Sequence, residues 1–139
     1  MSVVVDCSVA IAWYLPDETS VAAGRVLEYV IERGGVVPFL FRLEFANSLL
    51  MAERRKRIPR GFPGRAFAEL DDLQVVHDLE GHENVWSTCV ELADKHRLTA
   101  FDAAYLELAQ RSRLPLATLD KALRRAAEQA GVEPFSTFR

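Results

Sequence analysis

Short apolar runs alternate along the chain with longer segments in which apolar residues recur every three or four positions. The runs are of strand length and the best of them are rich in β-branched residues, whereas the periodic segments are typical of helices that bury one face. The apolar runs predict strands at residues 2–5, 36–41, 74–77, 114–118 and 132–136. The periodic segments predict helices at residues 8–15, 20–33, 43–56, 64–73, 82–95, 102–111 and 121–130.

Strands this apolar, separated by helices, indicate a mostly parallel sheet that is covered on both faces. We therefore expect an α/β fold, a three-layer α/β/α sandwich with a mostly parallel central sheet of four to five strands. The length of 139 residues is that of about one domain, so residues 1–139 are predicted to form a single domain. No apolar run is long enough for a membrane span and no signal peptide opens the chain, which predicts a cytoplasmic protein without a membrane partner.

The net charge of -3, from 17 basic and 20 acidic residues, argues at first sight against a nucleic-acid partner. The charges are segregated, however, because residues 54–65 carry six bases and no acid while residues 66–94 carry eight acids and no base. A partner responds to the local field, so the net charge does not exclude RNA. The candidate RNA-binding residues lie near the ends of two predicted helices and are Arg54, Arg55, Arg57, Lys121, Arg124 and Arg125. Bases at a helix C-terminus also have an ordinary structural explanation, since they complement the helix dipole.

Four acidic residues fall at the edge of the sheet where the functional crevice of an open α/β fold lies. Asp6 ends the first predicted strand and Glu44 follows the second. Asp120 follows the strand at 114–118, and Asp102 opens the helix before that strand. Each acid alone also has a structural interpretation, as a helix cap or as a partner of the helix dipole. Together, however, carboxylates ~5 Å apart repel by about 3 kcal/mol per pair, which a fold tolerates through protonation or a bound cation.

Carboxylate oxygens are typical ligands of hard divalent cations, so the four acids predict Mg²⁺ or Mn²⁺ as the cofactor. Zinc is not indicated, because the three histidines lie on separate segments without a pair at ligand spacing. The two cysteines also lack such spacing and are expected to be reduced thiols. Polar neighbours that would orient the ligands or hold a water are Ser8, Asn47 and Thr118. Ser8 and Thr118 have a structural alternative as a cap and a strand residue.

Four stretches of the chain together resemble the PIN-domain ribonucleases. They are Val3–Val9, Glu44 with Asn47, Leu98–Leu106 and Leu116–Asp120. The length and the run Thr118–Leu123 resemble most the VapC-type toxins of prokaryotic toxin-antitoxin pairs. The resemblance covers the whole chain in order, and residues 98–123 are its most specific part.

This resemblance implies a PIN-like fold and a Mg²⁺- or Mn²⁺-dependent endoribonuclease. Asp6, Glu44, Asp102 and Asp120 would be both the catalytic and the metal-binding residues. In such an enzyme a metal-activated water attacks an RNA phosphodiester in line. The resemblance also implies a homodimer and inhibition by a cognate, VapB-like antitoxin whose C-terminal segment enters the active site.

Two other classes of function compete with this hypothesis. A non-catalytic PIN-like module would bind RNA or a protein without cutting it, and the presence of all four acids argues against it. Aspartate-based phosphatases and receiver domains also use an acid after the first strand, but the phosphatases need a second Asp where Ser8 stands and the receivers need adjacent acids. Cys7 is not expected to be a nucleophile, because no histidine is predicted beside it.

Overall fold

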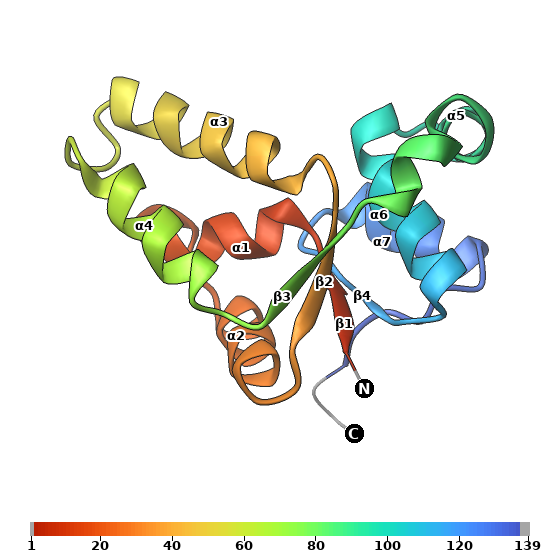
Figure 1. The fold of residues 1–139 in the computed structure, drawn as a ribbon, viewed down its shortest axis with the longest axis horizontal. Helices are drawn as coiled ribbons and strands as arrows, with labels where there is room; N and C mark the ends of the chain where they lie inside the picture. Colours follow the sequence, from red (N-terminus) through yellow and green to blue (C-terminus); the bar gives the residue numbers. More distant parts are fainter. Residues whose placement is uncertain (1, 137–139) are drawn as a thin grey trace.

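The computed structural model describes residues 2–136 and contains a parallel sheet between two sets of helices (Figure 1). Within these residues the sheet has four strands in the order β3-β2-β1-β4. The strands are β1 at Val3–Val5, β2 at Gly35–Pro38, β3 at Val75–Asp78 and β4 at Leu116–Ala117. Val4 pairs with Val36 on one side and with Leu116 on the other. All strands point the same way, so their carboxyl ends share one edge.

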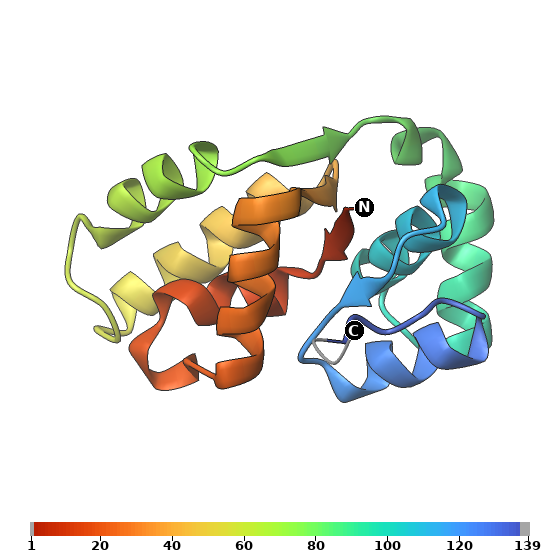
Figure 2. The ribbon, with the colours of Figure 1, turned by 90° about the horizontal axis from the view of Figure 1, so that it is seen from below.

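Helices α1 to α4 lie on one side of the sheet and α5 to α7 on the other, as the two views agree (Figures 1 and 2). The α-helices are α1 Cys7–Tyr14, α2 Val21–Arg33, α3 Phe41–Arg54, α4 Phe62–Asp71, α5 Val90–His96, α6 Ala100–Ser112 and α7 Lys121–Gln129. Shorter segments are the 3₁₀ helices η1 Pro16–Glu18 and η2 Glu80–Asn84 and the π-helical turn η3 Val85–Cys89. No helix within residues 2–136 is long and apolar enough to cross a membrane.

The core forms around β1 and α6. Val3–Val5 are almost completely buried, because β1 has a strand on each side and helices over both faces. Helix α6 buries the continuous run Ala103–Ala109, since it contacts three strands as well as α5 and α7. The alanines of this run allow close packing against the sheet. Because α6 leads into β4 and runs opposite to it, the first turn of α6 lies at the carboxyl edge of the sheet.

An ion-pair network joins this central helix to the outer strand β3. The guanidinium of Arg111, on α6, donates to Glu107 Oε2 at 2.6 Å and to Asp78 Oδ2 at 2.7 Å. Asn84 also donates to Glu107, at 3.2 Å. Gly81 fits closely over the network, where a Cβ atom would lie 3.0 Å from Asp78 Oδ2. The network therefore fastens η2 and the end of β3 to α6.

The predicted fold class is confirmed, with four strands among the described residues. The predicted last strand at 132–136 is wrong, because this segment contributes only one bridge, between Leu116 and Pro134. Backbone hydrogen bonds flank that bridge, from Leu116 N to Glu133 O and from Phe135 N to Leu116 O. Proline has no N–H with which to extend a ladder, so pairing stops there. Met1 and residues 137–139 of the predicted domain lie outside the described residues.

Two further boundaries differ from the prediction. The second strand ends at Pro38 and not at residue 41, because Leu40 already has helical backbone angles and Phe41 is the first residue of α3. The apolar run thus continues from a buried strand into a buried helix, which hydrophobicity alone does not separate. The single helix predicted at 82–95 is divided into η2, η3 and α5.

Candidate active site

The four predicted acids all follow a strand or open a helix at the carboxyl edge of the sheet. Asp6 comes directly after β1, and Asp120 lies between β4 and α7. Glu44 is in the first turn of α3, just after β2, and Asp102 is in the first turn of α6. Three of the acids thus follow the neighbouring strands β2, β1 and β4 in the chain, and the fourth lies on the helix that packs across these strands.

Asp6 is the most buried of the four, with 4% of its surface exposed. Its Oδ2 accepts hydrogen bonds from the hydroxyls of Ser8, at 2.5 Å, and Thr118, at 2.8 Å. Asp6 stands at the N-cap position of α1, and its side chain makes no regular capping hydrogen bond, although the backbone N–H of Ser8 in the first turn lowers its pKa. The two hydroxyls instead hold the carboxylate between β1 and β4, and neither is bonded to Oδ1.

The same two hydroxyls also hold the loop that carries Asp120. Ser8 Oγ accepts from the backbone N–H of Leu119 at 3.1 Å, and Thr118 Oγ1 accepts from that of Asp120 at 3.0 Å. Ser8 and Thr118 therefore hold the side chain of Asp6 and the backbone at Asp120 together, and their role beside metal ligands stays a prediction. The exposed side chain of Asn47, in contrast, makes no hydrogen bond within residues 2–136.

Helix capping explains part of the arrangement at the other two helices of this edge. Asp120 Oδ1 accepts from the N–H of Leu123 at 2.8 Å and so caps α7, as its structural interpretation predicted. Helix α6 is capped by Thr99, whose hydroxyl accepts from the N–H of Asp102 at 3.1 Å. The cap on α6 thus comes from Thr99, and Asp102 contributes only its backbone N–H to that bond.

Tyr105 belongs to the site and was missed by the sequence interpretation. Its phenol donates to Glu44 Oε1 at 2.6 Å, and the residue is fully buried. The signal available in the sequence is its position three residues after Asp102, on the same face of the same helix. Cys7 also hydrogen-bonds Glu44, and burial raises the pKa of its thiol far above the usual value, which supports the expectation that it is not a nucleophile.

Burial and mutual repulsion raise the pKa of three of the four acids. For Asp6 burial raises the pKa, the bonds from Ser8 and Thr118 oppose it, and the charge of Asp120 adds to it. For Glu44 the same effect of burial is opposed by Tyr105 and reinforced by Asp6 and Asp102. The pKa of Asp102 is raised by burial and by the charges of Asp6 and Asp120. The four carboxylates thus share one electrostatic environment.

The four carboxylates form a donor set with the chemistry of a divalent-cation site. None of the four acids forms an ion pair with another described residue, so their charge is not balanced within residues 2–136. Hard oxygen donors in a partly buried, electronegative site are the ligands that Mg²⁺ and Mn²⁺ prefer. Within the same residues no group of three His, Cys, Asp or Glu side chains is close enough to hold a metal as it stands. The chemistry of the four carboxylates fits the cation, although their present arrangement does not form a complete metal site.

The predicted RNA-binding residues divide into two groups. Arg57 donates to Asp17 at 2.9 Å and to Glu18 at 2.7 Å, so its charge is matched within the chain and the prediction for it is not supported. Arg54 and Arg55 are exposed at the far end of α3, and Lys121, Arg124 and Arg125 are exposed on α7. Arg124 also lines a groove of about 500 Å³ that reaches Thr118, and Arg25, from α2, lines it too.

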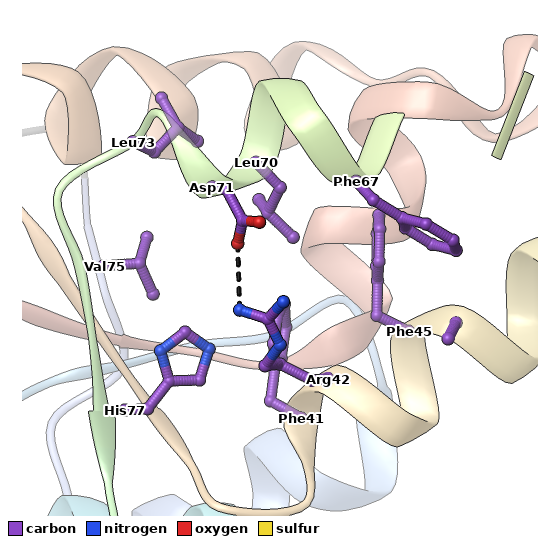
Figure 3. A pocket seen from close by; sticks show the side chains of 10 residues that line it. Phe41, Arg42, Phe45, Phe67, Leu70, Asp71, Leu73, Val75 and His77 are labelled. Carbon is purple, nitrogen blue, oxygen red and sulfur yellow. Dashed lines mark hydrogen bonds and ion pairs between the residues drawn. The ribbon is translucent and has the colours of Figure 1, made fainter. Parts of the chain in front are cut away.

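Two other hollows lie on the surface, and like the groove beside Thr118 they are lined by none of the four acids. A small apolar pocket of about 180 Å³ lies between α3, α4 and β3, where Arg42 and Asp71 form an ion pair across it (Figure 3). None of the four acids lines this pocket. A larger apolar groove of about 690 Å³ lies beside the first turns of α3 and α6, and its lining includes the strongly exposed side chains of Leu43, Trp86 and Phe101.

Comparisons with known proteins agree with this architecture. The model of the PIN domain family matches residues 3–129. Ribonuclease VapC3 of Pyrobaculum aerophilum is 32% identical over 123 residues, which are 88% of this chain and 92% of that protein.

Two solved structures share the fold. PAE2754 from Pyrobaculum aerophilum has a TM-score of 0.65 at 22% identity, covering 91% of this chain and 84% of that one. FitAcB from Neisseria gonorrhoeae has a TM-score of 0.65 at 15% identity, covering 96% of both chains. With the family model spanning nearly all of the described residues, the chain belongs to the PIN domain family.

Proposed function

We propose that this protein is a Mg²⁺- or Mn²⁺-dependent endoribonuclease and the toxin of a toxin-antitoxin pair. The observation that carries the proposal is the set of four carboxylates at one sheet edge, three with raised pKa and none in an ion pair within residues 2–136. If these acids served only to stabilise the fold, neutral residues in their place would stabilise it more, because burial and mutual repulsion disfavour the charged carboxylates. The similarity to Ribonuclease VapC3 supports RNA as the substrate.

In this proposal Asp6, Glu44, Asp102 and Asp120 hold the cation. When bound, the cation supplies a positive charge for the phosphodiester and lowers the pKa of the attacking water. The chain contributes the fixed positions of the ligands. Ser8 and Thr118 hold Asp6 through one oxygen, and the cap on α7 holds Asp120 through one oxygen, so each acid has a second oxygen for other partners.

The test is cleavage of a labelled structured RNA by the purified protein, with Mg²⁺ or Mn²⁺ and with excess EDTA. We expect site-specific cuts that need the cation and leave a 5'-phosphate and a 3'-hydroxyl, because water is the nucleophile. Products that end in a 2',3'-cyclic phosphate would contradict the mechanism. If the protein binds the RNA but does not cleave it with either Mg²⁺ or Mn²⁺ present, the non-catalytic binding module would be favoured.

The groove beside Thr118 is the path that we propose for the RNA backbone. Arg124 lines it, and Lys121 and Arg125 share the same exposed helix, directly after Asp120. Lys and Arg side chains that neutralise phosphates raise the affinity for RNA, and this gain falls as the salt concentration rises. The cluster at Arg54 and Arg55 is a more distant candidate, since ten residues of helix α3 separate Arg54 from Glu44, about 15 Å by helix rise.

Reversing the charge of Arg124 tests this path. Arg124→Glu is expected to weaken RNA binding and to reduce the slope of log K against log salt by about one, because one phosphate contact is lost. The measurement is a titration of labelled RNA with EDTA present, at several salt concentrations. Arg33→Glu is the matched control, since it changes the net charge equally and Arg33 is the last residue of α2 and does not line the groove. Equal behaviour of the two variants would remove Arg124 from the path.

The toxin hypothesis also proposes partners for the protein. A VapB-like antitoxin would place its C-terminal segment at the carboxylates, and its cationic side chains would match their charge. We further propose a homodimer, for which the apolar groove with Leu43, Trp86 and Phe101 is a suitable face because such large exposed apolar patches mark contact surfaces. The absence of a membrane-spanning helix within residues 2–136 fits the cytoplasmic location that we propose.

A further inference from the structure

Helix α6 contributes two polar groups to the site, one from each of its first two turns. Asp102 is the acid of the first turn, and Tyr105 follows three residues later. Tyr105 is fully buried, and its phenol donates to Glu44 Oε1 at 2.6 Å. A buried phenol must find a partner, because an unpaired one costs about 1–3 kcal/mol. Within residues 2–136, Glu44 is the partner that this fold provides.

Glu44 needs such a hydrogen bond to keep its carboxylate at the site. It is only partly buried, on a long side chain, beside the charges of Asp6 and Asp102. Like-charge repulsion and side-chain entropy both favour rotation of a free carboxylate towards solvent. Asp6 is held against the same repulsion by Ser8 and Thr118, whereas the bond from Tyr105 is the one hydroxyl contact described for Glu44.

We infer that Tyr105 is a positioning residue that holds Glu44 through Oε1 and leaves Oε2 free to bind the divalent cation. This inference rests on the proposed metal-dependent nuclease function. Within residues 2–136 the other side chain that hydrogen-bonds Glu44 is Cys7, whose neutral thiol is a weak donor that a cation can displace from a carboxylate oxygen. Partners that orient a metal ligand in this way typically change metal affinity by about 10–100-fold when they are removed.

The variant Tyr105→Phe removes the hydroxyl and keeps the buried ring. We expect its affinity for Mn²⁺, measured by isothermal titration calorimetry without RNA, to fall by about 10-fold or more. Tyr14→Phe is the matched control and should bind Mn²⁺ like the wild type, since Tyr14 ends α1 on the far side from Asp6 and has no described hydrogen bond to an acid. A wild type that binds Mn²⁺ and a Tyr105→Phe variant that binds it equally well would overturn the inference and leave the proposed function intact.

A double-mutant cycle separates positioning from a general loss of structure. If Tyr105 acts through Glu44, then adding Tyr105→Phe to Glu44→Ala should change Mn²⁺ affinity no further. A further 10-fold loss in that background would overturn the inference, because the hydroxyl would then act by another route. A wild type with no affinity for Mn²⁺ or Mg²⁺ would instead contradict the proposed function, and the inference with it.

A spectroscopic measurement on the folded wild-type sequence covers the case in which Tyr105→Phe does not fold. The chain has three tyrosines, so fluorotyrosine-labelled protein gives one ¹⁹F resonance for each, assigned with Tyr14→Phe and Tyr29→Phe. We expect saturating Mg²⁺ to shift the Tyr105 resonance and to leave the resonance of Tyr14 unchanged. A Tyr105 resonance that stays in place while Mg²⁺ binds would overturn the inference.

Discussion

Asp6→Asn is expected to lower the rate of RNA cleavage by about 10³-fold or more and to abolish growth arrest when the protein is expressed in cells. The substitution removes a proposed charged ligand of the cation, and a bound cation contributes several kcal/mol to such a reaction, at about 1.4 kcal/mol for each factor of ten. The amide oxygen of Asn can still accept from Ser8 and Thr118, so the link between β1 and β4 is retained. Cleavage of labelled RNA and growth curves measure the two effects.

Asp102→Asn should behave in the same way, whereas Asp94→Asn is the matched control, because Asp94 is an exposed acid on α5. Full activity of Asp6→Asn or Asp102→Asn would contradict the assignment of the site. Growth arrest by neither the wild type nor the control would contradict the toxin hypothesis.

Asp6→Asn also has a predictable effect on the stability of the fold. A measurement of that stability shows whether the variant loses activity because it unfolds. Burial raises the pKa of Asp6 above its ordinary value of 3.8, so the ionised form destabilises the folded state. Its contribution to stability is therefore lost as the pH rises from 3.8 through the raised pKa. In metal-free buffer at neutral pH, Asp6→Asn should unfold at the same temperature as the wild type or higher.

Arg111→Met is expected to lower the free energy of unfolding by about 3–5 kcal/mol, the largest effect on stability that we predict. The variant keeps an apolar stem and removes the guanidinium that pairs with Glu107 and Asp78. Glu107 is 4% exposed, so its charge would remain buried with only Asn84 as a described partner. Breaking a buried pair from one side costs this much because the other charge is left uncompensated. Urea denaturation measures the change.

Arg42→Met is the control for this prediction, because its ion pair with Asp71 is exposed and should contribute less than about 1 kcal/mol.

The pH dependence of stability gives a second check on the role of Arg111. The hydrogen bond from Arg111 lowers the pKa of Asp78 below 3.8, so the stability that this pair contributes is present at neutral pH and is lost as the pH falls through the lowered pKa. The difference between wild type and Arg111→Met should therefore shrink in acid. A difference that stays constant down to pH 2 would contradict the assignment.

The periodicity of the chain predicted the fold class and most of the helices, because burial of one helix face or of a whole strand leaves a local pattern. The periodicity did not predict accurately where individual strands and helices begin and end. The run through Pro38 to Phe41 is apolar throughout, yet its first half is a strand and its second half begins a helix, since both are buried. The segment around Pro134 reads as a strand but forms only one bridge.

The four acids could be selected from the sequence, because each stands next to a predicted strand end or helix start, and parallel strands bring such positions to one edge. Their individual surroundings could not be predicted. Asp6 and Asp120 occupy equivalent positions before a helix, yet Asp120 caps α7 and Asp6 does not cap α1. The carboxylate of Asp6 is instead held by the hydroxyl of Ser8 and by that of Thr118, and Thr118 lies 112 residues away in the chain and beside Asp6 across the sheet.

The sequence by itself therefore determined the fold class, the family resemblance and which acids lie at the carboxyl edge of the sheet, which depend on local patterns of polarity and on residues at strand ends. The tertiary structure alone decided which partners those acids have. The bonds from Thr118 to Asp6 and from Tyr105 to Glu44 join residues on different elements, as does the ion pair that occupies Arg57. Such contacts depend on how the elements pack, and no periodicity along the chain encodes them.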